Sequence, residues 1–350
     1  MENTPKKYDV TIKKLPKSQI EITAAISASE FDASRSEAIK HVGKDAALPG
    51  FRKGHVPEKM LVSRIGEAAI LEEMAEISIS KAYPEILITE KIDALGRPEV
   101  RITKVAPGNP LEFTITTAVF PEVTLPDHKK IAGKIAGRKD EAKVTDEEVE
   151  NTLAQIRKMR AQGEAKKAGL EFDEKAELPA LDVEYVKTLG AFDSIKAFTD
   201  ELRVNIGKEK EREVRDKKRV AIMEALIKDA EIELPQIIVD QELRRMQDEF
   251  AHEIERMGMT FDAYMKAVGK SQEEMEKEWL PDAEKRAKTQ LVTSKIAEVE
   301  SITPDKELME REAAALRSQY PDASEDRIYS YIEMLLTNEK VFQFLETQGS

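Results

Sequence analysis

Residues 49–57 combine the residue types of a loop that recognises an anionic partner, and they read Pro-Gly-Phe-Arg-Lys-Gly-His-Val-Pro. Gly50 and Gly54 allow positive φ, while a proline at each end restricts the backbone, so we expect a loop of defined shape. Arg52 and Lys53 then stand at its tip as adjacent positive charges. The simpler alternative is a solvated loop that only joins two helices.

The sequence around this loop is basic, although the chain as a whole is acidic. The 350 residues include 55 Lys and Arg against 68 Asp and Glu, which gives a formal net charge of -13. A basic tip on an acidic chain favours one docking orientation toward an anionic surface. Near the loop only Asp45 and Glu58 oppose the cations. The surrounding basic residues are Lys40, Lys44, His55, Lys59 and Arg64.

The string from Gly50 to Pro57 resembles the ribosome-docking signature of the trigger factor family, the bacterial chaperones that sit at the ribosomal exit tunnel. It departs from the family pattern at His55, where lysine is usual. The resemblance implies that the loop cations pair with ribosomal RNA phosphates or with acidic side chains of a protein at the exit tunnel. It also implies that the aromatic ring packs into an apolar recess. The ribosome-binding residues that it implies are Gly50, Phe51, Arg52, Lys53, Gly54, His55 and Pro57.

Other kinds of chemistry find little support in the sequence. There is no cysteine, which excludes disulfides, thiolate metal sites and a cysteine nucleophile. The four histidines are far apart and form no zinc-binding pair. No glycine-rich phosphate-binding string occurs, and the many carboxylates follow helical charge patterns that are typical of solvated faces. We therefore expect no metal and no cofactor. The histidines are His41, His55, His128 and His252.

Most of the 12 methionines lie in the second half of the chain. Methionine is flexible and polarizable, which suits a surface that accepts many apolar shapes. The alternative is that these methionines pack in the core, because most of them fall on helical apolar stripes. The stretch from Met257 to Phe261 reads as a corner between two helices. The candidate client-binding residues are Met246, Met257, Met259, Phe261 and Met265.

The first third of the chain predicts a sheet interrupted by helices. Alternating apolar residues predict strands over 8–15, 19–27, 99–105 and 111–120. Helices are expected over 30–44, with Ser29 as N-cap, from Pro57 to near Gly66, and over 68–90, where Pro84 kinks or interrupts the helix. Because paired runs joined by short turns need no crossover, we expect an antiparallel sheet covered by helices on one face.

We expect a helix from Thr145 to about Gln162, and from Leu181 the periodicity is helical almost to the end. Thr145 to Glu148 and Ser271 to Glu274 are capping boxes, which mark helix starts. The further predicted helices cover 194–229, 236–257, 271–298 with a kink at Pro281, one capped by Thr303 and Pro304, and a last pair from Ser324 to near residue 345. The expected fold class is α+β, with a mostly helical carboxy-terminal part and arm-like helices.

In the trigger factor family a peptidyl-prolyl isomerase domain of the FKBP type usually follows the helix that opens at Thr145. Here residues 163–176 alone separate that helix from Glu177-Leu178-Pro179, which resembles the family's re-entry into its carboxy-terminal domain. A domain needs about 50 residues at least. The expected organisation is a ribosome-binding domain over 1–119, an extended linker over 120–143, a helix and short connector over 144–176 in place of the isomerase domain, and a helical chaperone domain over 177–350.

Together these features predict an ATP-independent chaperone that docks on the large ribosomal subunit and holds nascent or unfolded polypeptides. We expect a cytoplasmic protein without membrane contact, because no apolar run approaches the roughly 20 residues of a bilayer span. We expect no enzyme activity. The resemblance also implies that the free chain can form a homodimer. The alternatives are a peptidyl-prolyl isomerase, as in full-length family members, and a helical adaptor for one folded partner.

Overall fold

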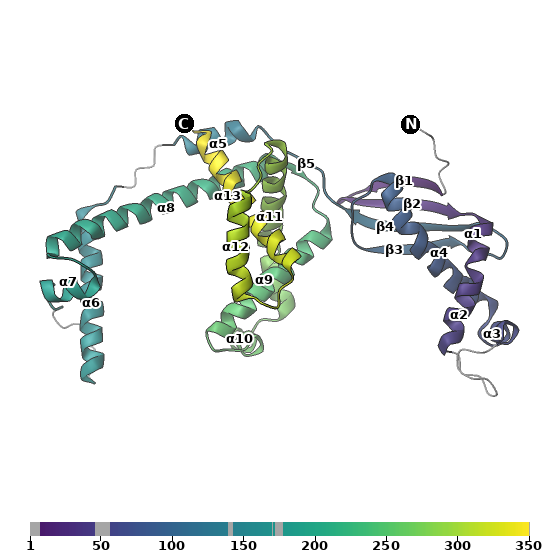
Figure 1. Cartoon of the computed structure of the whole chain (residues 1–350), viewed down its shortest axis with the longest axis horizontal. Coiled ribbons are helices and arrows are strands. Elements are labelled where there is room, and N and C mark those ends of the chain that lie inside the picture. Colours follow the sequence, from purple (N-terminus) through teal and green to yellow (C-terminus); the bar gives the residue numbers. More distant parts are fainter. Residues whose placement is uncertain (1–7, 46–56, 139–142, 170, 172–177, 350) are drawn as a thin grey trace. The chain divides into compact units, whose positions relative to one another are not determined.

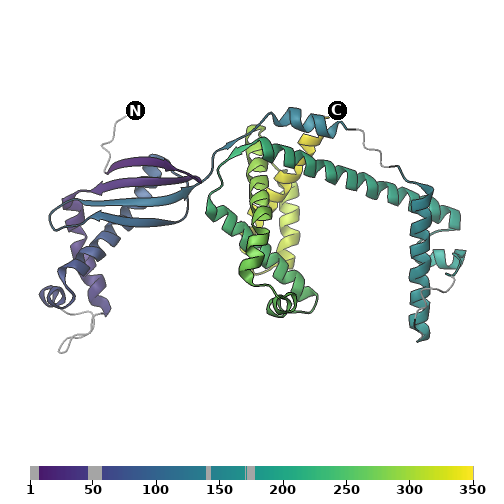
Figure 2. The ribbon, with the colours of Figure 1, turned by 180° about the vertical axis from the view of Figure 1, so that it is seen from behind.

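The computed structural model describes residues 8–45, 57–138, 143–169, 171 and 178–349. It confirms the α+β class, with an antiparallel sheet near the amino terminus and helices in most of the rest (Figure 1; Figure 2 from behind). The chain divides into two compact units. The first unit comprises residues 1–124 and 230–292, and the second comprises residues 125–229 and 293–350.

The sheet of the first unit consists of two hairpins, as the alternating sequence predicts. Its strand order is β1-β2-β4-β3, and all neighbours are antiparallel. Ile22 at its centre pairs with Ile12 on one side and with Ile115 on the other. The strands are β1 (Asp9–Leu15), β2 (Gln19–Ile26), β3 (Ala94–Lys104) and β4 (Leu111–Val119).

Helix α4 (Glu67–Glu90) packs against one face of this sheet and closes the core of the amino-terminal domain (Figure 1). Alternate residues of β2 and β4 point into this core, whereas the residues between them remain more exposed. The completely buried side chains include Ile22, Ile70, Phe113 and Ile115. The alternation of the strands therefore sets which face the helices cover.

Neither proline inside a long helix interrupts it. Helix α4 runs through Pro84, and helix α11 (Gln272–Val299) runs through Pro281. Both prolines are exposed. The carbonyl that loses its hydrogen bond at each proline can therefore be solvated, which limits the cost of the break.

The single helix expected over 30–44 is wrong, because the structure has two helices there. They are α1 (Ala28–Ala33) and α2 (Arg35–Asp45). The break falls at Ser34, which is buried and accepts a hydrogen bond at Oγ from Ser78 Oγ of α4, over 2.8 Å. This partner is 44 residues away, so the local sequence pattern could not reveal the break.

Two predicted helix caps are also wrong. Ser27, and not Ser29, caps α1, and Asp305, and not the pair 303–304, caps α12 (Lys306–Gln319). Each capping side chain accepts a hydrogen bond from the backbone N–H three residues later, at 3.4 Å and 3.0 Å. The aspartate adds a negative charge at the positive end of the helix, which favours this start over the threonine upstream.

The remaining part of the first unit is helical except for a short ribbon. In the ribbon, β5 (Val123–Thr124) pairs with β6 (Glu231–Ile232). The predicted capping box before α11 is confirmed: Glu274 N donates to Ser271 Oγ at 3.3 Å, and Ser271 N donates to a Glu274 carboxylate oxygen at 2.8 Å. The other helices of this part are α3 (Glu58–Ile65), α9 (Gln236–Arg256), α10 (Phe261–Val268) and the first part of α11.

The second unit is built from helices. The capping box at Thr145 is confirmed, and it starts a helix that extends to residue 168, beyond the predicted end at 162. One helix stands where we expected a last pair, because α13 continues without a break from residue 325 to 347. The helices are α5 (His128–Ala136), α6 (Asp146–Ala168), α7 (Val183–Leu189), α8 (Ile195–Asp229), the end of α11, α12 and α13 (Glu325–Thr347).

The expectation of an extended chain over 120–143 is wrong, because helix α5 lies within that segment. Its glycines serve close packing and do not mark a loop. A Cβ atom at Gly133 would lie 2.7 Å from the Gln348 carbonyl oxygen, at the end of α13. Ala132 and Ile135 of the same helix are buried. The small residues thus allow α5 to approach a backbone that comes from the carboxy terminus.

Candidate functional site

Of the predicted docking loop, residues 49–57, the structure describes only Pro57. Gly50, Phe51, Arg52, Lys53, Gly54 and His55 lie outside the described residues. Pro57, the last residue of the signature, is exposed and occupies the N-cap position of α3 in an extended conformation. Helix α2 ends at residue 45 and α3 begins at residue 58, so the loop connects two helices of the amino-terminal domain, as predicted.

The auxiliary cations lie on these two helices. Lys40 and Lys44 are one turn apart on α2, and Lys59 and Arg64 are on α3. All four side chains are exposed, and none makes an ion pair with a side chain that the structure describes. Gly43 lets the helices pack closely, since a Cβ atom there would lie 3.0 Å from a Leu61 methyl group. These cations are therefore available to an external anion.

Arg35, which the sequence analysis did not single out, ties together the helices around the loop. It stands at the start of α2 and donates to Glu58 Oε1, at the start of α3, over 3.1 Å. It also makes a two-pronged contact with Glu67 at the start of α4, with Nη2 donating to Oε2 over 3.0 Å. The hydrogen bond from Arg35 holds the pKa of the Glu67 carboxyl below its ordinary value. No sequence signal marks this cluster, because its partners lie 23 and 32 residues away.

We predict that Arg35→Gln lowers the free energy of unfolding at neutral pH by about 1 kcal/mol, since the ion pairs are partly exposed. The Glu67 pKa is lowered in the folded state, so its stabilising contribution is present above the unfolded pKa and is lost as the pH falls through the folded pKa. The difference between variant and wild type should thus shrink as the pH falls below about 4 and vanish below the folded-state pKa of Glu67. Urea unfolding over a pH series measures this difference. Arg101→Gln, at an exposed arginine of β3, is the control and should show no such pH dependence; a difference that persists at low pH would contradict the assignment.

Met257 and Met259 are the most exposed of the client-binding candidates, and they lie at the corner between α9 and α10. We call residues 257–259 the methionine corner. Gly258 has a positive φ of 81° and ends α9, with its N–H bonded to Glu255 O at 2.9 Å. The N–H of Met259 bonds to Ile254 O at 3.2 Å, which completes a Schellman motif. Met257 is 65% exposed and Met259 is 44% exposed. The helix end therefore holds two apolar side chains in solvent.

An aromatic cluster supports the helices that carry this corner. The Phe250 ring of α9 contacts the rings of Phe261, Tyr264 and Trp279 edge-on, at centroid distances of 6.4, 5.2 and 5.3 Å. All four rings are half-buried. Such edge-to-face pairs stabilise the packing beyond their buried area. Helices α9, α10 and α11 are therefore fixed around one ring.

The structure distributes the other client-binding candidates differently. Met265 is only 9% exposed and packs inside, so its inclusion in a client surface is corrected. Met246 is half-buried on α9, and Phe261 belongs to the aromatic cluster. Helical spacing alone cannot separate these cases, because core and surface methionines both follow apolar stripes.

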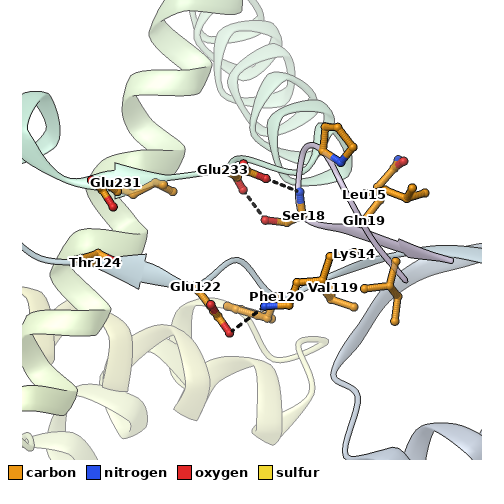
Figure 3. Close-up of a pocket in the computed structure, with 13 residues that line it drawn as sticks. Lys14, Leu15, Ser18, Gln19, Val119, Phe120, Glu122, Thr124, Glu231 and Glu233 are labelled. Atoms are coloured by element: carbon orange, nitrogen blue, oxygen red, sulfur yellow. Dashed lines mark hydrogen bonds and ion pairs between the residues drawn. The ribbon is translucent and has the colours of Figure 1, made fainter. Parts of the chain in front are cut away.

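A cavity of about 640 Å³ lies elsewhere in the first unit, beside the β1–β2 turn (Figure 3). Lys17 and Ser18 in this three-residue turn have positive φ angles of 60° and 49°. Ser18 Oγ donates to Glu233 O over 2.6 Å, next to strand β6. The contact fixes the turn against the residue that follows β6.

The described residues place no three histidine, aspartate or glutamate side chains together in the way that a metal site requires. Among the described helices, none has both the length and the apolar character that crossing a bilayer would need.

Comparison with known proteins gives matches over both ends of the chain. A family model described as the bacterial trigger factor protein (TF) matches residues 8–156, and one for the carboxy-terminal part of that protein matches residues 194–346. The trigger factor of Natranaerobius thermophilus is 25% identical over 404 positions, which cover 93% of this chain and 90% of the relative. That of Bacillus subtilis is 25% identical over 380 positions, covering 85% and 89%.

Both alignments are longer than the 350 residues of this chain, so each relative contains residues that have no counterpart here. A solved structure from work titled "Promiscuous Substrate Recognition in Folding and Assembly Activities of the Trigger Factor Chaperone" has a similar fold. Its TM-score is 0.55 at 16% identity, with 98% of this chain and 100% of that chain covered.

Proposed function

The chain belongs to the bacterial trigger factor family of chaperones, and on this premise we propose that it docks on the large ribosomal subunit and holds nascent or unfolded polypeptides in the cytoplasm. Docking is assigned to residues 50–57, with Arg52 and Lys53 facing RNA phosphates or acidic side chains. Holding is assigned to the helical part of the chain. No nucleotide or cofactor is required for either step, and self-association of the free chain stays a prediction.

The availability of cations around the loop supports the docking proposal. Lys40, Lys44, Lys59 and Arg64 are exposed on the helices at both ends of the loop and have no ion-pair partner among the described side chains. Each phosphate that such a cation neutralises releases a counterion, so affinity falls as salt rises. Because the chain as a whole has a net charge of -13, an approach in another orientation would be repelled by the ribosome.

The methionine corner is the observation that carries the holding proposal. Two flexible apolar side chains stand in solvent close together on a rigid support, which suits contact with apolar segments of varied shape. Contacts through mobile side chains over a small area give weak and reversible binding, because much of the gain is offset by ordering. Weak binding suits a holder that must release its client without an energy source.

We predict that Met257→Ser with Met259→Ser weakens binding of an unfolded client about tenfold, since each side chain loses part of its apolar burial in the complex. Suppression of the aggregation of a chemically unfolded protein, measured by light scattering, reports this loss. Met159→Ser on α6 is the matched control, because this methionine is 68% exposed and lies outside the corner. If the control lost as much aggregation suppression as the double variant, or if the double variant lost none, the corner would not be the client-binding site.

Between the two matched regions, the described residues of the segment 157–193 include the end of α6 and helix α7. Arg157 of α6 donates from Nε to Pro179 O over 2.8 Å and from Nη2 to Leu178 O over 2.7 Å. These bonds hold the returning chain against α6. We propose that this chain has no isomerase activity, because the matched regions are the amino- and carboxy-terminal parts of the family. Catalysed isomerisation of a proline peptide would favour the enzyme alternative, and binding to one folded partner alone would favour the adaptor.

A further inference from the structure

A groove runs between helix α4 and the edge strand β3, within the amino-terminal domain. Its volume is about 620 Å³. Glu72, Glu76, Ile79 and Tyr83, which share one face of α4, line one side, and Val100 and Ile102 of β3 line the other. We call this feature the α4–β3 groove. Helix α4 covers the centre of the sheet, and the groove lies at the edge of the contact between the helix and the sheet.

The β3 side of the groove is apolar and accessible. Val100 is 47% exposed and Ile102 is 38% exposed, although both project from the face of the sheet that α4 covers elsewhere. Ile79 is buried beneath them, and Tyr83 is fixed by a hydrogen bond from its hydroxyl to Thr117 Oγ1 at 3.3 Å. The groove is therefore a preformed concave surface that can accept a large apolar side chain.

Strand β3 is also the last strand of the sheet (Figure 1). Its inner side pairs with β4 over Glu99 to Ile102, between two irregularities of register. Its outer side pairs with no strand among the described residues. An extended peptide can add to such an edge through main-chain hydrogen bonds while its alternate side chains enter a neighbouring pocket.

The opposite rim of the groove is acidic. Glu72 and Glu76 lie one turn apart on α4, are exposed, and form no ion pair with a described side chain. A lysine or arginine next to the apolar side chain of the occupant would neutralise them. A peptide with acidic residues at those positions would be repelled.

We propose that the α4–β3 groove binds an extended polypeptide segment in which a large apolar residue neighbours a lysine or arginine, added as a further strand along β3. The inference deepens the proposed function, because the occupant is of the same unfolded class. It adds a second binding site, which lies outside the methionine corner and whose acidic rim favours basic apolar segments.

The absence of cysteine permits a local test in the full chain. Ser80→Cys places one thiol at the groove, and Ser63→Cys places one on exposed α3. The probe is a short peptide of alternating valine and lysine with a terminal pyridyl disulfide. The protein thiolate attacks the peptide sulfur and releases pyridinethione, whose absorbance gives the rate. Dividing by the rate with a small pyridyl disulfide corrects for thiol reactivity.

We expect disulfide exchange with the peptide, after correction for thiol reactivity, to be about tenfold faster in the Ser80→Cys variant than in the Ser63→Cys variant. The reason is that bound peptide raises the local disulfide concentration. Glu76→Lys and Ile102→Ser should each remove most of this gain. The matched controls should retain it: Glu99→Lys changes an acid on β3 that lies outside the groove, and Ile12→Ser changes an isoleucine of β1 that is 39% exposed.

Equal rates at the two thiols, or equal losses in the controls, would overturn the proposal. The proposal would also be overturned if the thiol at position 80 reacted more slowly with the small pyridyl disulfide as the protein concentration rose. That result would assign the groove to a second copy of the chain. Met257→Ser with Met259→Ser should leave the exchange unchanged. Failure of the groove and failure of the methionine corner are therefore seen in separate measurements.

Discussion

Replacing Arg52 and Lys53 together by glutamate is expected to abolish co-sedimentation with bacterial ribosomes at about 0.15 M salt, where screening is moderate. Each charge-assisted contact contributes about 1.5 kcal/mol or more, so losing both lowers the affinity about 100-fold or more, before any added repulsion. Suppression of client aggregation should be unchanged, because the methionine corner lies in another part of the chain. Pelleting through a sucrose cushion, with light scattering in parallel, measures both effects.

Lys166→Glu with Lys167→Glu is the matched control for this charge reversal. These lysines are adjacent, exposed and close to the end of α6, so the change in net charge is the same. The control should pellet with ribosomes nearly as well as the wild type. A charge-reversed loop that still pelleted, or a control that was lost equally, would show that net charge and not the loop decides binding.

Gly133→Ala should destabilise the second unit by about 1–3 kcal/mol, although alanine is the better helix former. The new Cβ would lie 2.7 Å from the Gln348 carbonyl oxygen, and a backbone atom cannot move aside as a side chain can. Gly163→Ala is the matched control, since this glycine is also helical and a Cβ atom added there would meet no other atom within 4 Å. The control should be neutral or stabilising by up to about 1 kcal/mol. Urea unfolding measures both; equal effects in the two variants would contradict the close contact.

The sheet could be predicted from the sequence because its signals are local. Alternation in β2 and β4 marks one face for burial, and short turns restrict the pairing to antiparallel neighbours. The capping box at Thr145 was likewise correct, because both of its hydrogen bonds lie within one turn. Features that depend on a few adjacent residues can be predicted in this way.

The errors arise where a distant partner decides the structure. Ser34 breaks a helix because Ser78 bonds to it across the core. In the sequence, Gly133 is typical of a linker. In the structure it lies in a helix, because it packs against the backbone at the end of α13. In both cases the local pattern is compatible with two structures, and tertiary contacts select one of them.

The candidate sites follow the same division. The docking string was recognisable because its residues are contiguous, and its role stays a prediction. Arg35 was missed because its two partners lie at the starts of two other helices, 23 and 32 residues away. Among the methionines, Met259 is exposed and Met265 is buried, and only the path of the chain after Gly258 separates them.

The most direct test of the account uses ribosomes stalled with an unfolded nascent chain. A photo-cross-linking amino acid replaces Met257, and cross-links to the nascent chain are compared between the otherwise unchanged protein and the protein that also carries Arg52→Glu and Lys53→Glu. We predict cross-links with the intact loop that are lost on charge reversal and weaken steadily with salt. Cross-links that persist after charge reversal, or none with the intact loop while free clients are still held, would contradict a chaperone that docks through this loop to hold nascent chains.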